Sequence, residues 1–220
     1  SRSNSIGGAP RTCPQTSTRG DRMKLRAMTL LCCPKCRQSL RLEAVGVEDD
    51  DIESGWLICT DCPKAYAIVR GVPRFVADDW YAGRDGLAWD SVSRSYLDSV
   101  SGTREAEDDL EACTGWSFSD YRGRLVLDVG VGTGRFAEVV AQSGGEVVGV
   151  DFNAAVDAAS RNLRRFSRAH VVQADLARLP FRDETFDMAY SMGVLHHTPG
   201  PREAFARIAR RHELFPVARF

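Results

Sequence analysis

In the second half of the chain, short apolar runs typical of β-strands alternate with segments that have apolar residues at helical spacing. The strand-like runs cover residues 125–129, 147–150, 170–173 and 186–191. The helix-like segments cover residues 136–142, 154–166 and 202–211. Strands that alternate with helices predict an α/β fold with a Rossmann-like, doubly wound and mostly parallel sheet, which binds ligands at the carboxyl ends of its strands.

In the first half of the chain, apolar and polar residues alternate on both sides of an acidic turn. The alternating segments are residues 40–47 and 56–58, and four acidic residues, 48–51, lie between them. This pattern is typical of a β-hairpin. A Cys-x-x-Cys motif lies before the first segment and another follows the second, so we predict a small separate module over residues 28–76.

Residues 77–124 are expected to form a helical connector between the two parts. Ala106, Leu110 and Cys113 have helical spacing and predict an amphipathic helix over residues 105–113. Aromatic residues are interspersed with polar ones at Trp80, Tyr81, Trp89 and Tyr96. Packing between helices is one interpretation of these aromatic residues, and a lid over the ligand is the other.

The first residues contain almost no large apolar side chains and are rich in Ser, Thr, Gly, Arg and Pro. Such a segment buries too little surface to order itself, so we expect a disordered tail over residues 1–22. Met23 and Met28 lie just before the first patterned segment, which favours upstream or tag sequence for the tail. Its arginines leave a transit peptide as the alternative.

The composition fits one medium-sized domain with a small module. The chain has 220 residues, of which 43% are hydrophobic and 27% charged, and its formal net charge is -1. This near-neutral balance lacks the basic signature of many nucleic-acid-binding domains, so a nucleic-acid partner is unsupported. No apolar run approaches the ~18 residues of a membrane helix, so we expect no membrane association and a cytoplasmic location.

Four cysteines have the spacing of a structural zinc site. Cys33 and Cys36 form one Cys-x-x-Cys unit, Cys59 and Cys62 form the other, and a hairpin between them brings two pairs of thiolates together. Ordinary buried or redox-active thiols are the alternative. Cys32 adjoins Cys33 and leaves an ambiguity, although only Cys33 has the right spacing to Cys36. Four thiolates leave no open position for water, so the predicted Zn²⁺ is structural.

Other cysteines have no partner at ligand spacing. Cys13 is interpreted as a residue of the tail and Cys113 as a core residue.

Further residues give this module a family resemblance. The two cysteine motifs are followed by Tyr66-Ala67-Ile68 and Gly71-Val72-Pro73-Arg74-Phe75. Together they resemble the zinc-ribbon family of the small activator subunit that partners tRNA and rRNA methyltransferases. The resemblance implies a docking or stabilising role, with a protein partner bound through the ribbon. It also implies a methyltransferase domain downstream, since such ribbons occur fused ahead of one.

The residues 125–134 predict a strand, a tight glycine turn and a helix start. Asp128 ends the β-branched run, and Gly130, Gly132 and Gly134 follow at alternate positions. Glycine permits a positive φ and lets a ligand approach the backbone closely. The helix that follows directs unpaired N–H groups toward the same place. A nucleotide-like ligand is the first hypothesis.

Each of the first three predicted strands carries an acidic residue at or just after its end, namely Asp128, Asp151 and Asp175. An acid after the second strand suits ribose hydroxyls, which holds for NAD as well. The glycines, however, do not have the G-x-G-x-x-G spacing of dinucleotide sites. The acid before them would repel a pyrophosphate but suits a cationic ligand, so an NAD-binding oxidoreductase is disfavoured.

Several further motifs occur in order. They are Val148-Gly149-Val150-Asp151, Gln173-Ala174-Asp175-Leu176, Leu179-Pro180-Phe181, Phe186-Asp187 and Ser191-Met192-Gly193-Val194-Leu195-His196-His197. With the glycine turn, they resemble class I S-adenosylmethionine (SAM) methyltransferases of the small-molecule type related to ubiquinone-biosynthesis enzymes. The resemblance covers about residues 125–210 and implies SAM as cofactor and a small molecule as methyl acceptor.

The resemblance also implies roles for individual residues. Gly130, Gly132 and Gly134 wrap the methionyl part of SAM, and Asp128 orients its ammonium. Asp151, with Phe152 beside it, takes the ribose hydroxyls. Asp175 and Leu176 meet the adenine, and Met192 lies near the sulfonium.

Methyl transfer is an in-line displacement at carbon with the sulfonium as leaving group, so positioning supplies much of the acceleration. A hydroxyl or phenol acceptor also needs a base, for which His196 or His197 is suited at neutral pH. We take His196 as the catalytic candidate, and a structural or cofactor-packing histidine is the alternative. The arginines at 161, 164, 165 and 168 are interpreted as a solvated helix face.

The resemblance implies a Pro-Gly-Gly turn and three more strands after the last predicted helix. Residues 212–220 do not have that pattern, so we expect a truncated or frameshifted domain over residues 125–220, with a central strand left at an edge. The leading hypothesis is a SAM-dependent methyltransferase with an unidentified acceptor. The alternative is a non-catalytic docking protein that uses the ribbon and carries an inactive methyltransferase domain.

Overall fold

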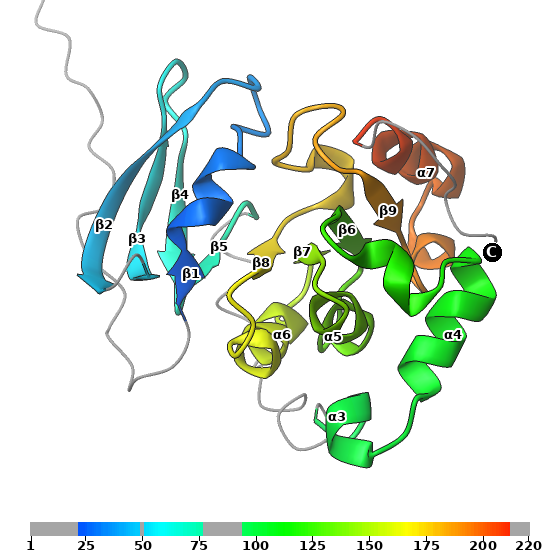
Figure 1. Ribbon diagram of the computed structural model, residues 1–220. Helices are drawn as coiled ribbons and strands as arrows, with labels where there is room; N and C mark the ends of the chain where they lie inside the picture. Colours follow the sequence, from blue (N-terminus) through cyan, green and yellow to red (C-terminus); the bar gives the residue numbers. More distant parts are fainter. Residues whose placement is uncertain (1–21, 49–50, 77–93, 212–220) are drawn as a thin grey trace, which may run out of the picture.

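The computed structural model describes residues 22–48, 51–76 and 94–211. These residues form a small antiparallel sheet and a larger α/β part that lie against each other (Figure 1). Within the described ranges, no helix combines the length and the apolar character that a membrane span requires. The expected tail over residues 1–22, apart from Arg22, lies outside the described residues, as do Trp80, Tyr81 and Trp89.

The N-terminal sheet is built around one long strand. Its strands are β1 (Met23–Lys24), β2 (Leu40–Glu48), β3 (Asp51–Cys59), β4 (Ala65–Val69) and β5 (Val72–Pro73). β3 pairs with β2 along one edge and with β4 and β1 along the other, all antiparallel. The predicted hairpin is confirmed. β1, which pairs with β3, and the 3-10 helix η1 (Leu25–Thr29) lie at the N-terminal side of this sheet.

The second sheet has four parallel strands in the order β8-β7-β6-β9. They are β6 (Leu125–Val129), β7 (Glu146–Asp151), β8 (Ala169–Gln173) and β9 (Met188–Tyr190). The predicted parallel α/β sheet is confirmed. β9 is shorter than the predicted run because the Phe186 N–H donates to the Arg211 carbonyl at 2.8 Å, away from the neighbouring strand. Among the described residues, β9 lies at one edge of this sheet.

Helices connect and cover these strands. They are α3 (Asp98–Ser101), α4 (Glu105–Thr114), α5 (Arg135–Gln142), α6 (Ala155–Leu163) and α7 (Pro201–Ala209). Three 3-10 helices accompany them, η2 (Phe118–Tyr121), η3 (Leu176–Arg178) and η4 (Leu195–His197). α6 ends before its predicted limit because the Phe166 N–H donates to the Leu163 carbonyl at 2.9 Å, which tightens the chain into a turn.

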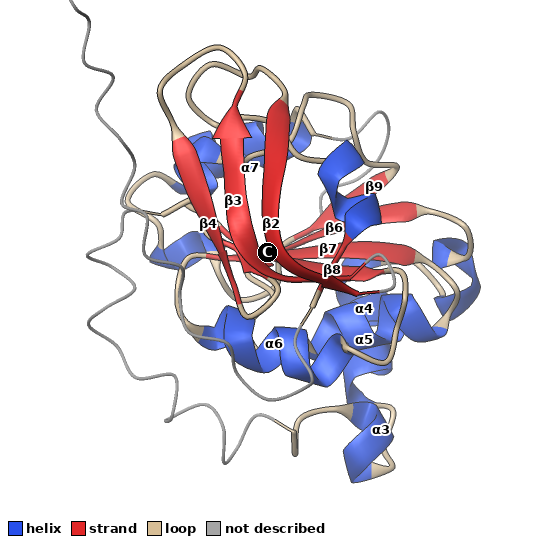
Figure 2. Ribbon diagram, turned by 90° about the vertical axis from the view of Figure 1, so that its left-hand side faces the viewer, coloured by secondary structure: helices blue, strands red, loops and turns tan. Residues whose placement is uncertain are grey.

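The parallel sheet has a different cover on each face. Val126 points into a buried cluster with residues of α4, α5 and α6. Leu127 and Val129 point into a cluster formed with η1, the ribbon strands and α7. Figure 2 shows α4, α5 and α6 on one side of the sheet and α7 on the other. The N-terminal module therefore supplies part of the second layer that a doubly wound sheet needs.

Backbone pairing also attaches the module to the edge strand β8. Arg74 forms a parallel bridge with Gln173, and the Phe75 N–H donates to the Gln173 carbonyl at 2.8 Å. Beside this bridge, Arg74 and Asp157 of α6 form an ion pair at 2.6 Å in which both side chains are only 5% exposed. The face of the module that carries Arg74 and Phe75 is therefore covered by β8 and α6 of the same chain.

Candidate functional site

The glycine turn and the predicted acidic residues lie together at the carboxyl-terminal end of the parallel sheet. β6 leads into residues 130–134, β7 ends at Asp151, and β8 leads to Asp175 two residues after Gln173. Because the strands are parallel and adjacent, their carboxyl ends lie side by side (Figure 1). This is the arrangement that the sequence predicts for a ligand bound at the carboxyl ends of the strands.

The three glycines of the turn all have positive φ, at 87° for Gly130, 52° for Gly132 and 93° for Gly134. A Cβ added at Gly130 would lie 2.1 Å from Cγ2 of Val194, so the fold itself requires glycine there. A Cβ at Gly132 would meet nothing within 4 Å. At Gly132, then, the protein leaves open space in front of the backbone.

Asp151 ties the end of β7 to this turn. Its Oδ2 accepts a hydrogen bond from the Gly132 N–H at 3.0 Å, and its Oδ1 accepts one from the Asn153 N–H at 3.2 Å. The carboxylate is only half-buried. It therefore orders the glycine turn and keeps lone pairs for hydroxyl groups of a ligand.

Asp128 lies deeper, on the face of β6 toward α5, and is 1% exposed. Neither of its oxygens makes a hydrogen bond of normal geometry within the described residues. Burial raises the pKa of Asp128 to about 7, against the opposing effect of the Tyr190 hydroxyl beside it. A buried carboxyl that lacks a hydrogen bond of normal geometry is unusual, and its chemistry fits a cationic group.

Phe152 and Asp175 contribute to a cavity of about 540 Å³. Asp175 caps η3 through its Oδ1, which accepts the Ala177 N–H at 2.8 Å, and the side chain of Leu176 packs against the core. Phe152 is 37% exposed. The opposite wall belongs to the N-terminal module and is formed by Pro34, Lys35, Lys64, Ala65, Tyr66, Phe75 and Val76.

The segment after β9 carries the remaining predicted residues. Met192 is half-buried and packs against the buried cluster that contains Val126 and residues of α4, α5 and α6. Leu195 is 1% exposed and anchors η4, whereas His196 and His197 are both exposed with ring centroids 3.8 Å apart. An exposed imidazole is accessible for proton transfer, and in the described residues nothing directs it toward a defined acceptor.

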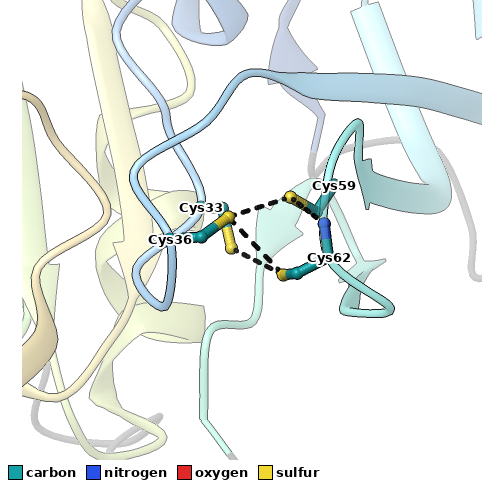
Figure 3. A group of neighbouring side chains, drawn as sticks. All are labelled: Cys33, Cys36, Cys59 and Cys62. Carbon is teal, nitrogen blue, oxygen red and sulfur yellow. Dashed lines mark hydrogen bonds between the residues drawn. The ribbon is translucent and has the colours of Figure 1, made fainter.

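The four predicted cysteines converge between the two knuckles of the module. Their sulfur atoms all lie within 4.8 Å of one another, as Figure 3 shows. Cys36 Sγ is 3.3 Å from Cys59 Sγ and 3.5 Å from Cys62 Sγ, and Cys33 Sγ is 3.7 Å from Cys62 Sγ. Tetrahedral zinc–thiolate bonds of about 2.3 Å place sulfur atoms about 3.8 Å apart. The donor set and its spacing fit a structural Zn²⁺.

Two neighbours refine this metal site. Tyr66 Oη lies 3.3 Å from Cys33 Sγ. Although burial opposes it, this hydrogen bond and two backbone N–H groups lower the pKa of Cys33 to about 6, which favours the thiolate that a metal needs. Cys32 is fully buried outside the cluster, and its N–H donates to the Pro180 carbonyl at 2.8 Å. The ambiguity is resolved in favour of Cys33.

Sequence reasoning missed the residues that join the module to the parallel sheet. Arg37 donates to the carbonyls of Leu179, at 2.8 Å, and of Phe181. Arg74 stands as a charge in an apolar run, which is the one signal that could have indicated a buried ion pair. Its partner Asp157 lies on a helix with ordinary surface spacing, so nothing in the sequence singles it out.

Comparison with known proteins follows the same two-part division. Residues 127–212 match a family model described as a methyltransferase domain, and residues 24–71 match one described as Trm112p-like protein. The demethylmenaquinone methyltransferase of Clavibacter sepedonicus is 28% identical over 130 residues, which are 58% of this chain and 53% of that protein. The tRNA U34 carboxymethyltransferase of Proteus mirabilis is 35% identical over 88 residues, 38% of this chain and 27% of that protein.

The chain spans about half or less of the length of these relatives. Among solved structures, a SAM-dependent methyltransferase from Aquifex aeolicus matches with a TM-score of 0.45 and 21% identity, over 58% of this chain and 65% of that one. A complex of the Haloferax volcanii Trm112 methyltransferase activator with a methyltransferase matches with a TM-score of 0.46 and 22% identity, over 60% of this chain and 57% of that one.

The parallel sheet, the glycine turn and the methyltransferase match define the class, that of Rossmann-like SAM-dependent methyltransferases. More particularly, the chain carries a methyltransferase domain preceded by a Trm112p-like module. The resemblances to the class I SAM methyltransferases and to the activator-subunit family are confirmed, and the small-molecule type stays a prediction.

Proposed function

We propose that this chain binds SAM at the carboxyl ends of β6, β7 and β8 and transfers its methyl group to an acceptor. The observation that carries the proposal is the hydrogen bond from the Gly132 N–H to the Asp151 carboxylate at 3.0 Å. Gly132 itself faces open space, because a Cβ added there would meet nothing within 4 Å. The orphaned Asp128 carboxyl, which suits a cation, supports the same ligand.

The individual roles are those that the family resemblance implies. Gly130, Gly132 and Gly134 would lie along the methionyl part of SAM, and Asp128 would orient its ammonium. Asp151 and Phe152 would hold the ribose, and Asp175 with Leu176 would contact the adenine. Met192 would lie near the sulfonium. When bound, SAM supplies an electrophilic methyl group on a positively charged leaving group.

What the protein adds is mainly position. The hydrogen bond from Gly132 to Asp151 fixes the turn relative to β7, so the ligand meets a backbone that is already ordered. His196 is exposed next to this edge and would accept the proton of a hydroxyl acceptor through its free ring nitrogen. An acceptor without an acidic proton would not need it.

The acceptor that we propose from the resemblance is a small molecule. The named relatives include a demethylmenaquinone methyltransferase and a tRNA U34 carboxymethyltransferase, so both acceptor classes require a direct assay. Transfer of a labelled methyl group from SAM to quinone-like phenols, compared with transfer to total tRNA, separates them. Replacement of His196 by Gln should lower transfer to a phenol by roughly 10²-fold or more, whereas His197→Gln serves as the control.

Cofactor binding is tested first, by titration calorimetry with S-adenosylhomocysteine, the demethylated product. We expect measurable heat that Asp151→Ala abolishes. Absence of binding at high protein concentration would refute the proposal for this chain. A thermal shift with NAD and none with S-adenosylhomocysteine would favour the oxidoreductase alternative instead.

The alternative of a docking protein makes a different prediction. The ribbon face that carries Arg74 is covered by β8 and α6, so a partner of this chain would have to use another face. Capture of a partner by the full chain, with no binding of S-adenosylhomocysteine, would favour that alternative.

A further inference from the structure

Gln173, the last residue of β8, is 2% exposed, and its side chain makes hydrogen bonds in two directions. Its Oε1 accepts a hydrogen bond from Nη1 of Arg74 at 3.1 Å, and its Nε2 donates one to the Phe152 carbonyl at 3.0 Å. Arg74 follows β5 of the N-terminal module, whereas Phe152 follows β7 at the proposed cofactor site. The buried amide therefore lies between the module and the cofactor site.

Arg74 determines which way this amide points. A guanidinium group only donates hydrogen bonds, so the amide oxygen of Gln173 must face Arg74 and the amide nitrogen must face the Phe152 carbonyl. Arg74 is itself held in place, because its Nη2 donates to Asp157 at 2.6 Å and to the Val69 carbonyl at 3.2 Å. The packing of the module against α6 thus sets the orientation of the Gln173 side chain.

The Phe152 carbonyl and the Asn153 N–H belong to the same planar peptide group. Gln173 holds the carbonyl end of this group, and the N–H end donates to Oδ1 of Asp151 at 3.2 Å. The other carboxylate oxygen of Asp151 accepts the Gly132 N–H at 3.0 Å. Rotation of the peptide group would break the hydrogen bonds at both of its ends, and the Asp151 carboxylate would lose one of these two contacts.

We call this chain of hydrogen bonds, from Arg74 through Gln173 and the 152–153 peptide group to Asp151, the relay. A buried amide needs hydrogen-bond partners wherever it lies, but it does not need these particular ones. Here the group that donates to Gln173 is the charged side chain that attaches the module. The group that accepts from it is the main chain beside the proposed ribose-binding acid. Two parts of the molecule are therefore joined by one continuous set of contacts.

We propose that Gln173 is a positioning residue of the cofactor site, and that through the relay the N-terminal module holds the Asp151 carboxylate in the orientation that binds ribose hydroxyls. This inference rests on the proposed binding of SAM. Because Gln173 is 2% exposed, it acts on the ligand through its neighbours and not by contact. A carboxylate released from the relay would adopt several orientations, and it would bind a ribose more weakly because its geometry is no longer fixed in advance.

The test variant is Gln173→Met, which keeps the length of the side chain and removes both of its hydrogen bonds. The control is Thr114→Val, which removes the hydrogen bond from another buried side chain to a backbone carbonyl, that of Leu110 at 2.6 Å. Thr114 ends α4, which contributes none of the proposed cofactor residues. Calorimetry measures the affinity for S-adenosylhomocysteine, and NMR measures the exchange of backbone amide hydrogens in the ligand-free full chain.

We expect Gln173→Met to weaken the binding of S-adenosylhomocysteine roughly tenfold, which is the usual effect of losing one well-placed hydrogen bond. In the same variant, the amide hydrogens of Asn153 and Gly132 should exchange roughly tenfold faster, because their acceptor is no longer held in place. The amide of Val148, in the middle of β7, should follow the change in global stability alone. Thr114→Val should melt at a lower temperature, with its affinity within about twofold of wild type.

Unchanged affinity, or unchanged exchange at Asn153 and Gly132, would overturn the inference and leave the proposed function intact. Equal acceleration of exchange along the whole chain, with the same loss of affinity in the control, would reduce Gln173 to a residue that only stabilises the fold. A wild-type chain that binds no S-adenosylhomocysteine would refute the proposed function, and the role of Gln173 in cofactor binding with it.

If Gln173→Met does not fold, Gln173→Glu replaces it, measured at about pH 8 so that the new carboxyl is ionised. The carboxylate still accepts from Arg74 but has no hydrogen to donate to the Phe152 carbonyl. We expect the same loss of affinity and the same faster exchange at Asn153 and Gly132. Wild-type values for both would contradict the relay.

Discussion

The carboxylate of Asp151 accepts a hydrogen bond from the backbone N–H of Gly132 at 3.0 Å, and so joins the end of β7 to the turn that follows β6. These two residues are 19 positions apart. Their contact fixes the floor of the proposed cofactor site, because it sets the turn against the neighbouring strand.

Replacement of Gly132 by Ala should distinguish the effect of backbone strain on stability from the effect of lost space on ligand binding. A Cβ at Gly132 meets nothing within 4 Å, and the same holds at Gly102, where φ is also positive. We therefore expect Gly132→Ala and Gly102→Ala to lose similar stability, about 1 kcal/mol each, from the positive φ.

Only Gly132→Ala should weaken the binding of S-adenosylhomocysteine, by tenfold or more as an order-of-magnitude estimate, because the methyl group fills space that the ligand needs. Thermal unfolding and calorimetry measure the two effects. Equal affinity in both variants would contradict the proposed position of the cofactor.

Removal of zinc should destabilise the ribbon and, through it, the parallel sheet. The module packs Leu31, Ile52 and Leu57 into the core that also covers β6 and β7. We expect about one zinc per chain by elemental analysis, and a lower melting temperature after treatment with a strong chelator.

Cys36→Ser should have the same effect as the chelator. Cys113→Ser should not, because Cys113 lies outside the cluster and is exposed, so its predicted place in the core is wrong. Freshly reduced protein that contains no metal and melts at an unchanged temperature would refute the four-cysteine site.

The buried ion pair between Arg74 and Asp157 should be a major contributor to the attachment of the ribbon. Removal of one partner leaves a buried charge uncompensated, so we expect Asp157→Asn to lower the free energy of unfolding by about 3–5 kcal/mol. Removal of the exposed pair between Arg41 and Glu43, in Glu43→Gln, should cost no more than about 1 kcal/mol. Urea denaturation of both variants makes the comparison, and equal destabilisation would show that burial of the first pair has no energetic consequence.

Asp128 should make stability fall as the pH rises toward neutrality. Burial, as the largest effect, raises its folded-state pKa from 3.8 to about 7, so the folded state binds a proton that the unfolded state releases. The stabilisation is fully present below about pH 4 and is lost as pH rises through about 7.

Measured as the difference between wild type and Asp128→Asn, the unfolding free energy should show this decline between pH 5 and 7.5, as approximate limits. Glu146 and His170, whose pKa values are lowered, act in the opposite direction, and the difference removes their contribution. A pH-independent difference would contradict the buried, unpaired state of Asp128.

The sequence by itself determined the two parts, the parallel sheet, the cysteine ligands and the acids at the strand ends. These follow from local information, namely the period of apolar residues, the spacing of two cysteine motifs and the glycines of one turn. The predicted helix over 105–113 and the strand over 125–129 match α4 and β6 closely for the same reason.

Tertiary structure alone decided how the parts fit together. The ribbon covers a face of its own chain's sheet, and Arg74 of the ribbon meets Asp157 of α6. Each of these contacts joins residues that are far apart in the sequence, and the charges involved have ordinary surface spacing locally. Burial and proximity, which give them their effect, arise only when the chain folds.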